Sequence, residues 1–145
     1  MKKMLFSVKG LVLSVGLLAG LSFFAFSNPA ISDSYYLDEE FRVQKSVADT
    51  FDLNSKKEMK SYFMNDIFDK NISKLSSDIN KKVLSAILLL SKDNKIGDFK
   101  PIIYLEGNDK LLIAIKHEDK TITLTEFDIS KDAPIIVKTQ TKEGK

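Results

Sequence analysis

Side chains that could act as nucleophiles or as acid–base groups are few in this sequence. There is no cysteine, and the one histidine, His117, comes just before a predicted turn at Glu118–Asp119. A serine or threonine nucleophile needs a positioned base beside it, and no Gly-x-Ser-x-Gly segment is present to supply such a serine. We therefore interpret His117 as a solvated residue of a hairpin and expect no nucleophilic catalysis.

Carboxylate groups form two pairs with the spacing of one helical turn, Asp49 with Asp52 and Asp66 with Asp69. Paired carboxylates can carry out acid–base chemistry when different surroundings separate their pKa values. Both pairs adjoin lysines on polar helix faces, and we expect both to be solvated. Residues 92–98 place a lysine and an isoleucine where a calcium loop needs oxygen ligands, and the Cys and His ligands that zinc prefers are scarce. The sequence predicts no catalytic residue, no metal site and no cofactor.

Two neighbouring strands, predicted at 99–105 and 110–117, indicate binding because both of their faces are apolar. A sheet that helices cover on one side is normally polar on the other. We predict that one of these faces is a candidate partner surface. Three alternatives for what covers it stay open: a helix of the same chain, a second copy or a protein partner. If the loop between the strands has an even length, this face is formed by Phe99, Ile103, Leu105, Leu112 and Ala114.

Hydrophobic periodicity predicts three helices before these strands. Apolar residues recur at helical spacing over 37–51, over 59–72 and over 75–90. The second run follows Ser55-Lys56-Lys57-Glu58, which has the pattern of a capping box. We expect the third helix to pack through Val83, Ile87 and Leu90 on the sheet face that carries Ile113, Ile115 and Ile122.

Alternation of apolar and polar residues predicts four strands, at 99–105, 110–117, 120–129 and 134–140. With Glu118–Asp119 as a two-residue turn, Ile115 lies opposite Ile122. Phe127 and Ile129 then break the alternation that Leu124 sets, and we expect a bulge near Glu126.

The fold class predicted from these elements is α+β, with about three N-terminal helices packed on a C-terminal four-stranded antiparallel meander. One such domain spans 37–141, after an extended lead-in at 28–36 and before a frayed tail at 142–145. The order of elements is similar to that of cystatin-like inhibitors and of two-helix, sheet-backed envelope assembly modules. The resemblance covers only that order, because the cystatins' Gln-x-Val-x-Gly turn has no counterpart here, and so it assigns no family.

Residues 1–27 are predicted to be a cleavable signal peptide. Three lysines precede an apolar run over 11–26, and Ala25-Phe26-Ser27 has the small-x-small pattern of a cleavage site. The run is short for a bilayer span, which needs roughly 20 apolar residues. Two alternatives stay open, an uncleaved anchor and a pilin-like precursor. Lys9-Gly10-Leu11 resembles the junction of type IV pilin-like precursors, although Val15 occupies the position of their glutamate.

Charge excludes one class of partner. The full chain carries a formal net charge of +2, but residues 1–27 hold three lysines and no acid, so 19 basic residues face 20 acidic ones after cleavage. A domain with a net charge of −1 and the single arginine Arg42 has no cationic field for phosphate backbones. We expect no nucleic-acid binding, and the preference for lysine over arginine is typical of an A/T-rich bacterial gene.

These observations predict an exported protein, periplasmic or secreted, that acts by binding and not by catalysis. Its expected partner is another protein, in an assembly-like or inhibitor-like role, or a second copy through the sheet. One alternative is a cone-shaped pocket that holds a small apolar ligand. The other is a membrane-anchored or pilin-like subunit, which would contact a membrane only if the N-terminal segment is retained.

Overall fold

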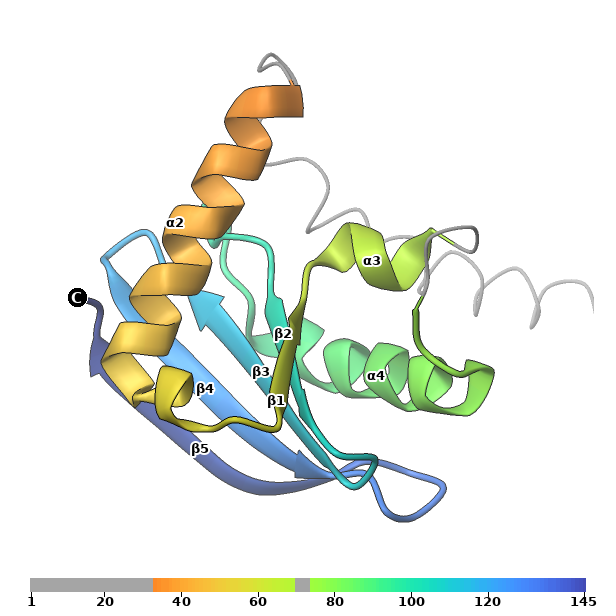
Figure 1. The fold of residues 1–145 in the computed structure, drawn as a ribbon. Coiled ribbons are helices and arrows are strands. Elements are labelled where there is room, and N and C mark those ends of the chain that lie inside the picture. Colours follow the sequence, from red (N-terminus) through yellow and green to blue (C-terminus); the bar gives the residue numbers. More distant parts are fainter. Residues whose placement is uncertain (1–32, 70–73) are drawn as a thin grey trace, which may run out of the picture.

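Five antiparallel strands form a continuous meander in the computed structural model, which describes residues 33–69 and 74–145 (Figure 1). Each strand pairs with its neighbours in the chain, in the order β1-β2-β3-β4-β5. The strands are β1 (Met59–Tyr62), β2 (Ile102–Glu106), β3 (Lys110–Lys116), β4 (Thr121–Asp128) and β5 (Ile135–Glu143).

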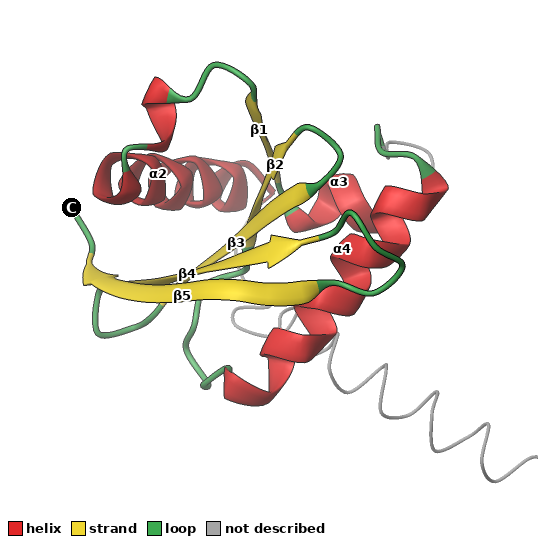
Figure 2. Ribbon diagram, turned by 90° about the horizontal axis from the view of Figure 1, so that it is seen from below, coloured by secondary structure: helices red, strands yellow, loops and turns green. Residues whose placement is uncertain are grey.

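Helices cover both faces of this sheet (Figure 2). The long helix α2 lies on one face, and α3 and α4 lie on the other. Two short 3₁₀ turns follow α2 and α4. The bounds are α2 (Asp33–Phe51), η1 (Leu53–Ser55), α3 (Met64–Phe68), α4 (Ser77–Leu90) and η2 (Ser91–Asp93). The α+β class is confirmed, but the sheet has five strands, and β1 lies between helices in the chain.

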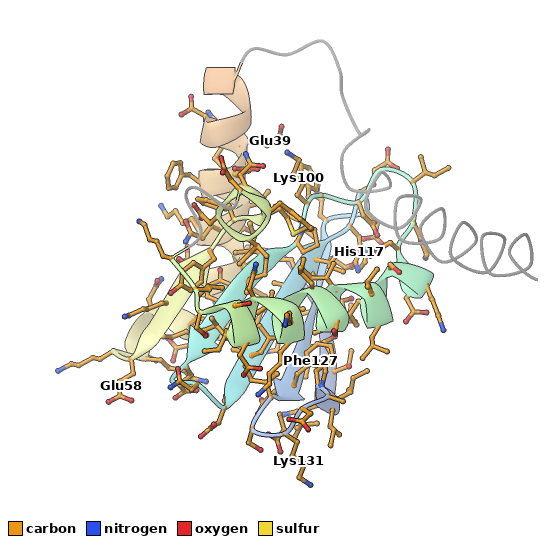
Figure 3. The ribbon with its side chains drawn as sticks, turned by 90° about the vertical axis from the view of Figure 1, so that its right-hand side faces the viewer. Glu39, Glu58, Lys100, His117, Phe127 and Lys131 are labelled. Carbon is orange, nitrogen blue, oxygen red and sulfur yellow. The ribbon has the colours of Figure 1, made fainter. Side chains whose placement is uncertain are left out.

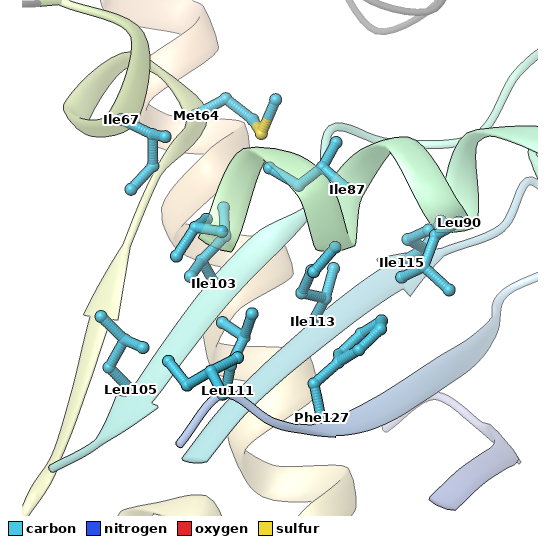
Figure 4. Close-up of a cluster of buried hydrophobic side chains, with 13 residues drawn as sticks. Met64, Ile67, Ile87, Leu90, Ile103, Leu105, Leu111, Ile113, Ile115 and Phe127 are labelled. Carbon is cyan, nitrogen blue, oxygen red and sulfur yellow. The ribbon is translucent and has the colours of Figure 1, made fainter. Parts of the chain in front are cut away.

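The face under α4 holds one hydrophobic core (Figure 4). Ser76 starts α4 as its N-cap, with its hydroxyl 3.3 Å from the N–H of Ile79. The buried residues of α4 then recur three and four positions apart, as one apolar stripe requires. They are Val83, Ala86, Ile87 and Leu90, and they pack with Ile103, Leu105, Leu111, Ile113, Ile115, Phe127 and Ile129.

The face under α2 holds a second core. Tyr104 contributes to it and also donates a hydrogen bond from its hydroxyl to Gln44 O, at 3.3 Å. Burial raises the pKa of the Tyr104 phenol. The buried members of this core are Val43, Val47, Ala48, Leu53, Ile102, Tyr104, Leu112, Ala114, Ile122 and Leu124.

The predicted second helix over 59–72 is wrong for most of its length. Met59–Tyr62 instead forms β1, which pairs with β2 so that Met59 lies opposite Glu106. Ser55 ends η1 and caps no helix, whereas the N–H of Phe63 donates to Asp66 Oδ2 at 2.9 Å where the short α3 begins. Pairing with the open edge of β2 outweighs the local helical spacing here. Residues 70–73 of the predicted helix lie outside the described residues.

The predicted two-residue turn after His117 is also wrong. The N–H of His117 donates to Thr121 O at 2.8 Å, so the loop has three residues, with Lys120 in a left-handed conformation at φ 70°. Ile115 therefore lies opposite Thr123, and Ile122 faces α2 and not α4. A bulge near Glu126 is present, but the extra residue is Val137 on β5. The predicted reason is wrong, because β4 alternates regularly and Leu124 faces α2 while Phe127 faces α4.

Both ends of the domain carry more structure than expected. Helix α2 begins at Asp33, inside the predicted lead-in at 28–36, and the remainder of that lead-in and the predicted signal at 1–27 lie outside the described residues. The predicted tail at 142–145 is held, because β5 continues to Glu143 and the N–H of Lys145 donates to Thr50 Oγ1 at 3.1 Å. The C-terminus lies beside the end of α2 (Figure 1).

Candidate functional site

A groove of about 900 Å³ runs along β4 and β5 on the α4 side of the sheet, past the end of that helix. Helix α4 ends at Leu90, so the outer strands receive no helical cover there. One wall is the segment 93–98, where Ile96 is 88% exposed, and the β3–β4 hairpin at 117–119 adjoins this wall. The floor is formed by Thr123, Thr125, Thr139 and Thr141.

Threonines form this floor in two cross-strand pairs. Thr123 lies opposite Thr141, with 3.0 Å between their hydroxyl oxygens, and Thr139 donates to Thr125 across 3.4 Å. β-branched residues suit a strand, and their hydroxyls provide hydrogen-bonding groups beside the uncovered sheet. The groove thus has a polar floor, in contrast to the two apolar cores.

His117 stands at the hairpin end of the groove, near the C-terminal part of α4 (Figure 3). Its Nδ1 lies 2.9 Å from Asp98 Oδ1, and its Nε2 lies 2.8 Å from Thr123 Oγ1. The Asp98 side chain is 5% exposed, and its other oxygen accepts the N–H of Lys95 at 2.9 Å. The histidine is therefore no solvated hairpin residue, since it ties the segment 95–98 to β4.

An acid, a base and a hydroxyl in this order also make the array from which serine-type hydrolases are built. With the Nδ1 proton donated to Asp98, Nε2 accepts the hydroxyl of Thr123. The spacing of these residues in the sequence gives no sign of the array. It forms because the three-residue loop sets Thr123 near His117, which the predicted two-residue turn did not allow.

Loop electrostatics also favour this geometry. Asp119 Oδ1 accepts the hydroxyl of Thr121 at 2.6 Å and the N–H of Thr121 at 2.9 Å. These hydrogen bonds lower the pKa of Asp119, the hydroxyl contributing most. The carboxylate thereby holds the loop in which Lys120 has its left-handed conformation.

The outer edge of β5 is the second feature of the site. Among the described strands, the nine-residue β5 pairs with β4 alone. The N–H of Gly144 donates to Lys120 O at 2.9 Å. Because hydrogen-bonded and non-hydrogen-bonded pairs alternate in an antiparallel ladder, the backbone N–H groups of Thr139 and Thr141 point away from β4. Within the described part of the chain, the edge is therefore a row of unused donors and acceptors beside the groove.

The first half of that edge is apolar and exposed. Ile135, Ile136 and Val137 are 48%, 51% and 59% exposed, and Ile136 also lines the groove. Long exposed edges with apolar side chains are the ones on which further strands pair. Edge and groove are thus one continuous surface, which we call the β5 surface (Ile135–Glu143 with the groove residues around Thr123).

The five residues predicted as one partner face are divided between the two cores. Ile103 and Leu105 face α4, whereas Leu112 and Ala114 face α2, where Phe99 also packs. The reason is the loop at 107–109, whose three residues place Ile103 opposite Ile113 and not beside Leu112. Helices of the same chain cover both faces of these strands.

The predicted carboxylate pairs serve local structure. Asp49 accepts a hydrogen bond from Asn54, Asp52 from Ser55, and Asp66 from Phe63. Across residues 33–69 and 74–145, no group of three or more metal-ligating side chains is placed to hold an ion. Nor does that part of the chain contain a helix with the length and apolar character of a membrane span.

Comparison with protein-family models, with curated proteins and with solved structures finds no match. The β5 surface itself is therefore the starting point for assigning a function.

Proposed function

We propose that this protein is an exported module that binds another protein by adding an extended segment of it to the free edge of β5. The observation that carries the proposal is the nine-residue edge with outward N–H groups at Thr139 and Thr141. In such recognition the main-chain hydrogen bonds supply affinity, and pockets for alternate side chains supply specificity. The groove along the same strand offers space for those side chains.

A small apolar ligand is a weaker candidate for this surface. Pockets for such ligands are concave and mostly apolar, whereas the groove floor is made of threonines. Apolar side chains already fill both sheet faces under the helices, as the full burial of Ile87 on one side and Val47 on the other illustrates. An extended peptide uses hydroxyl groups and strand edge together, and it is the occupant that we favour.

Catalysis at His117 is not part of the proposal. Acyl transfer needs donors arranged around a developing oxyanion in addition to a base and a nucleophile. The hydrogen bonds of His117 join two segments of the wall, a role that needs no turnover. Export is part of the proposal as well. Residues 1–32 would determine whether the exported protein is free or anchored.

The proposal is tested with Thr139→Pro. Proline removes the outward N–H and leaves the hydrogen bonds to β4 intact, because edge strands accept proline at such positions. The purified protein is used to select peptides from a phage-displayed library of random dodecapeptides. We expect the selected peptides to lose at least tenfold in affinity for Thr139→Pro, measured by fluorescence anisotropy.

Thr139→Val is the matched control, because it keeps the N–H and the shape of the side chain but loses the hydroxyl. We expect it to bind the selected peptides within about threefold of wild type, equivalent to roughly 0.7 kcal/mol. Circular dichroism and melting temperature check that both variants fold. Peptides that bind Thr139→Pro as tightly as wild type would show that the edge of β5 is not the binding element.

A further inference from the structure

Charges of alternating sign form a row across four strands on the α2 side of the sheet. Lys110 Nζ on β3 lies 3.3 Å from Glu106 Oε2 on β2 and 3.3 Å from Glu126 Oε1 on β4. Glu126 in turn lies opposite Lys138 on β5. We call Glu106, Lys110, Glu126 and Lys138 the charge row.

Within the charge row, the charges on β2, β3 and β4 lie beside charges of opposite sign. Burial lowers the pKa of Lys110, but the hydrogen bonds to Glu126 and Glu106 outweigh this and leave the pKa raised. Each carboxylate thus stands next to a lysine, and opposite charges on neighbouring strands stabilise a sheet.

Lys138 ends the charge row at the free edge. It is exposed and forms no ion pair with any residue in the described parts of the chain. Lys142 lies on the same face, four residues further along, with Nζ 4.9 Å from the centre of the Phe51 ring. At about 3.3 Å per strand residue, the two lysines are about 13 Å apart along the edge.

We propose, on the basis of the proposed strand addition, that the bound segment carries two acidic residues four positions apart. One carboxylate extends the charge row opposite Lys138, and the other lies opposite Lys142. Residues at the alternating positions face the groove, where β-branched and hydroxyl side chains match the threonine floor. The partner is therefore an extended acidic segment of another protein.

A second copy of β5 does not have this pattern. In antiparallel pairs centred on Gln140 or on either lysine, a lysine of one copy lies opposite a lysine of the other. Pairs centred on Thr139 or Thr141 avoid this, but they place no carboxylate opposite Lys138 or Lys142. Like charges directly opposite each other destabilise a sheet. Lysines on an edge strand also discourage self-association, which fits a site kept for a partner of opposite charge.

Two blocked heptapeptides test the inference, Val-Glu-Thr-Gln-Thr-Glu-Val and Val-Lys-Thr-Gln-Thr-Lys-Val. Each is titrated into the purified protein and followed by the amide chemical shifts of β5. We expect the acidic peptide to bind about tenfold more tightly than the basic one, because two cross-strand pairs change from attraction to repulsion. The preference should weaken at high salt.

Charge reversal supplies the decisive variants. Lys138→Glu with Lys142→Glu should invert the preference and favour the basic peptide. Lys57→Glu with Lys81→Glu makes the same change of net charge at exposed lysines before β1 and on α4, and it should keep the preference of wild type. Melting temperatures confirm that both double variants fold.

The outcomes separate this inference from the proposed function. Equal affinity of wild type for both peptides, or binding of neither at about 1 mM in the NMR titration, would overturn the acidic-segment inference. If Thr139→Pro binds the acidic peptide as tightly as wild type, strand addition itself is wrong and the inference fails with it. A dimer in light scattering that Thr139→Pro converts to a monomer would assign the edge to a second copy and overturn the inference.

Discussion

His117 is held at both ring nitrogens, by Asp98 and by Thr123. Its ring joins a loop and a strand that are 25 residues apart in the chain, counted from Asp98 to Thr123. The Asp98 side chain is almost fully buried, and a carboxylate in such a place needs its partners. His117 therefore contributes to the shape of the groove wall as well as to stability.

His117→Ala should lower the free energy of unfolding by about 1–3 kcal/mol, because it leaves the Asp98 carboxylate with one partner fewer in a buried site. Urea denaturation gives the value. Lys131→Ala, in the exposed β4–β5 loop, is the control and should stay within about 0.5 kcal/mol. A His117→Ala midpoint equal to that of wild type would restore the expectation from sequence, a solvated residue with no structural role.

At the scale of elements, α4 supplies the clearest comparison. Ile87 is 1% exposed under the helix, whereas Leu89, two residues on, is 46% exposed. Ile87→Ala should cost about 2–5 kcal/mol from lost burial and the cavity that it leaves. Leu89→Ala should change stability by about 0.5 kcal/mol or less. Thermal or urea unfolding of the two variants checks this, and equal losses would mean that α4 packs on the sheet through another face.

Elements with one strong period could be predicted from the sequence. The stripe of α4, the continuous apolar runs of β2 and β3 and the alternation in β4 identify their elements, since each pattern matches the face or faces that the element buries. β1 could not be predicted, because four residues with two half-buried ends fit a helix as well as a strand.

The predicted pairing registers of the strands were wrong for a different reason. A hairpin loop of three residues, in place of two or four, exchanges the faces of every residue on the following strand. At 118–120 the left-handed residue is Lys120, not the glycine or asparagine that would have indicated it. The predictions for the candidate site were wrong for the same reason. Loop length determines both that Thr123 lies near His117 and that Ile103 and Leu112 face different cores.

At the scale of the whole molecule, one sheet serves two cores. Residues of a single strand alternate between them, so that Leu111 and Ile113 face α4 while Leu112 and Ala114 face α2. The chain has no cysteine and must be stable through packing alone. Contacts at the chain end contribute, since Ser46 on α2 donates to Lys145 O at 2.7 Å. β5 is thus fixed at its end while its outer edge stays open.

The predicted signal at 1–27 bears on where the proposed binding takes place. Cleavage after Ser27 leaves Asn28–Ser32 before α2, so the signal peptidase would not cut into the folded part. We expect intact-mass spectrometry of the protein from a bacterial expression host to show a chain that begins at Asn28, in the soluble fraction outside the cytoplasm. A chain that begins at Leu11 would favour the pilin-like route. One that begins at Met1 in the membrane fraction would favour an anchored subunit, with the β5 surface presented from the membrane.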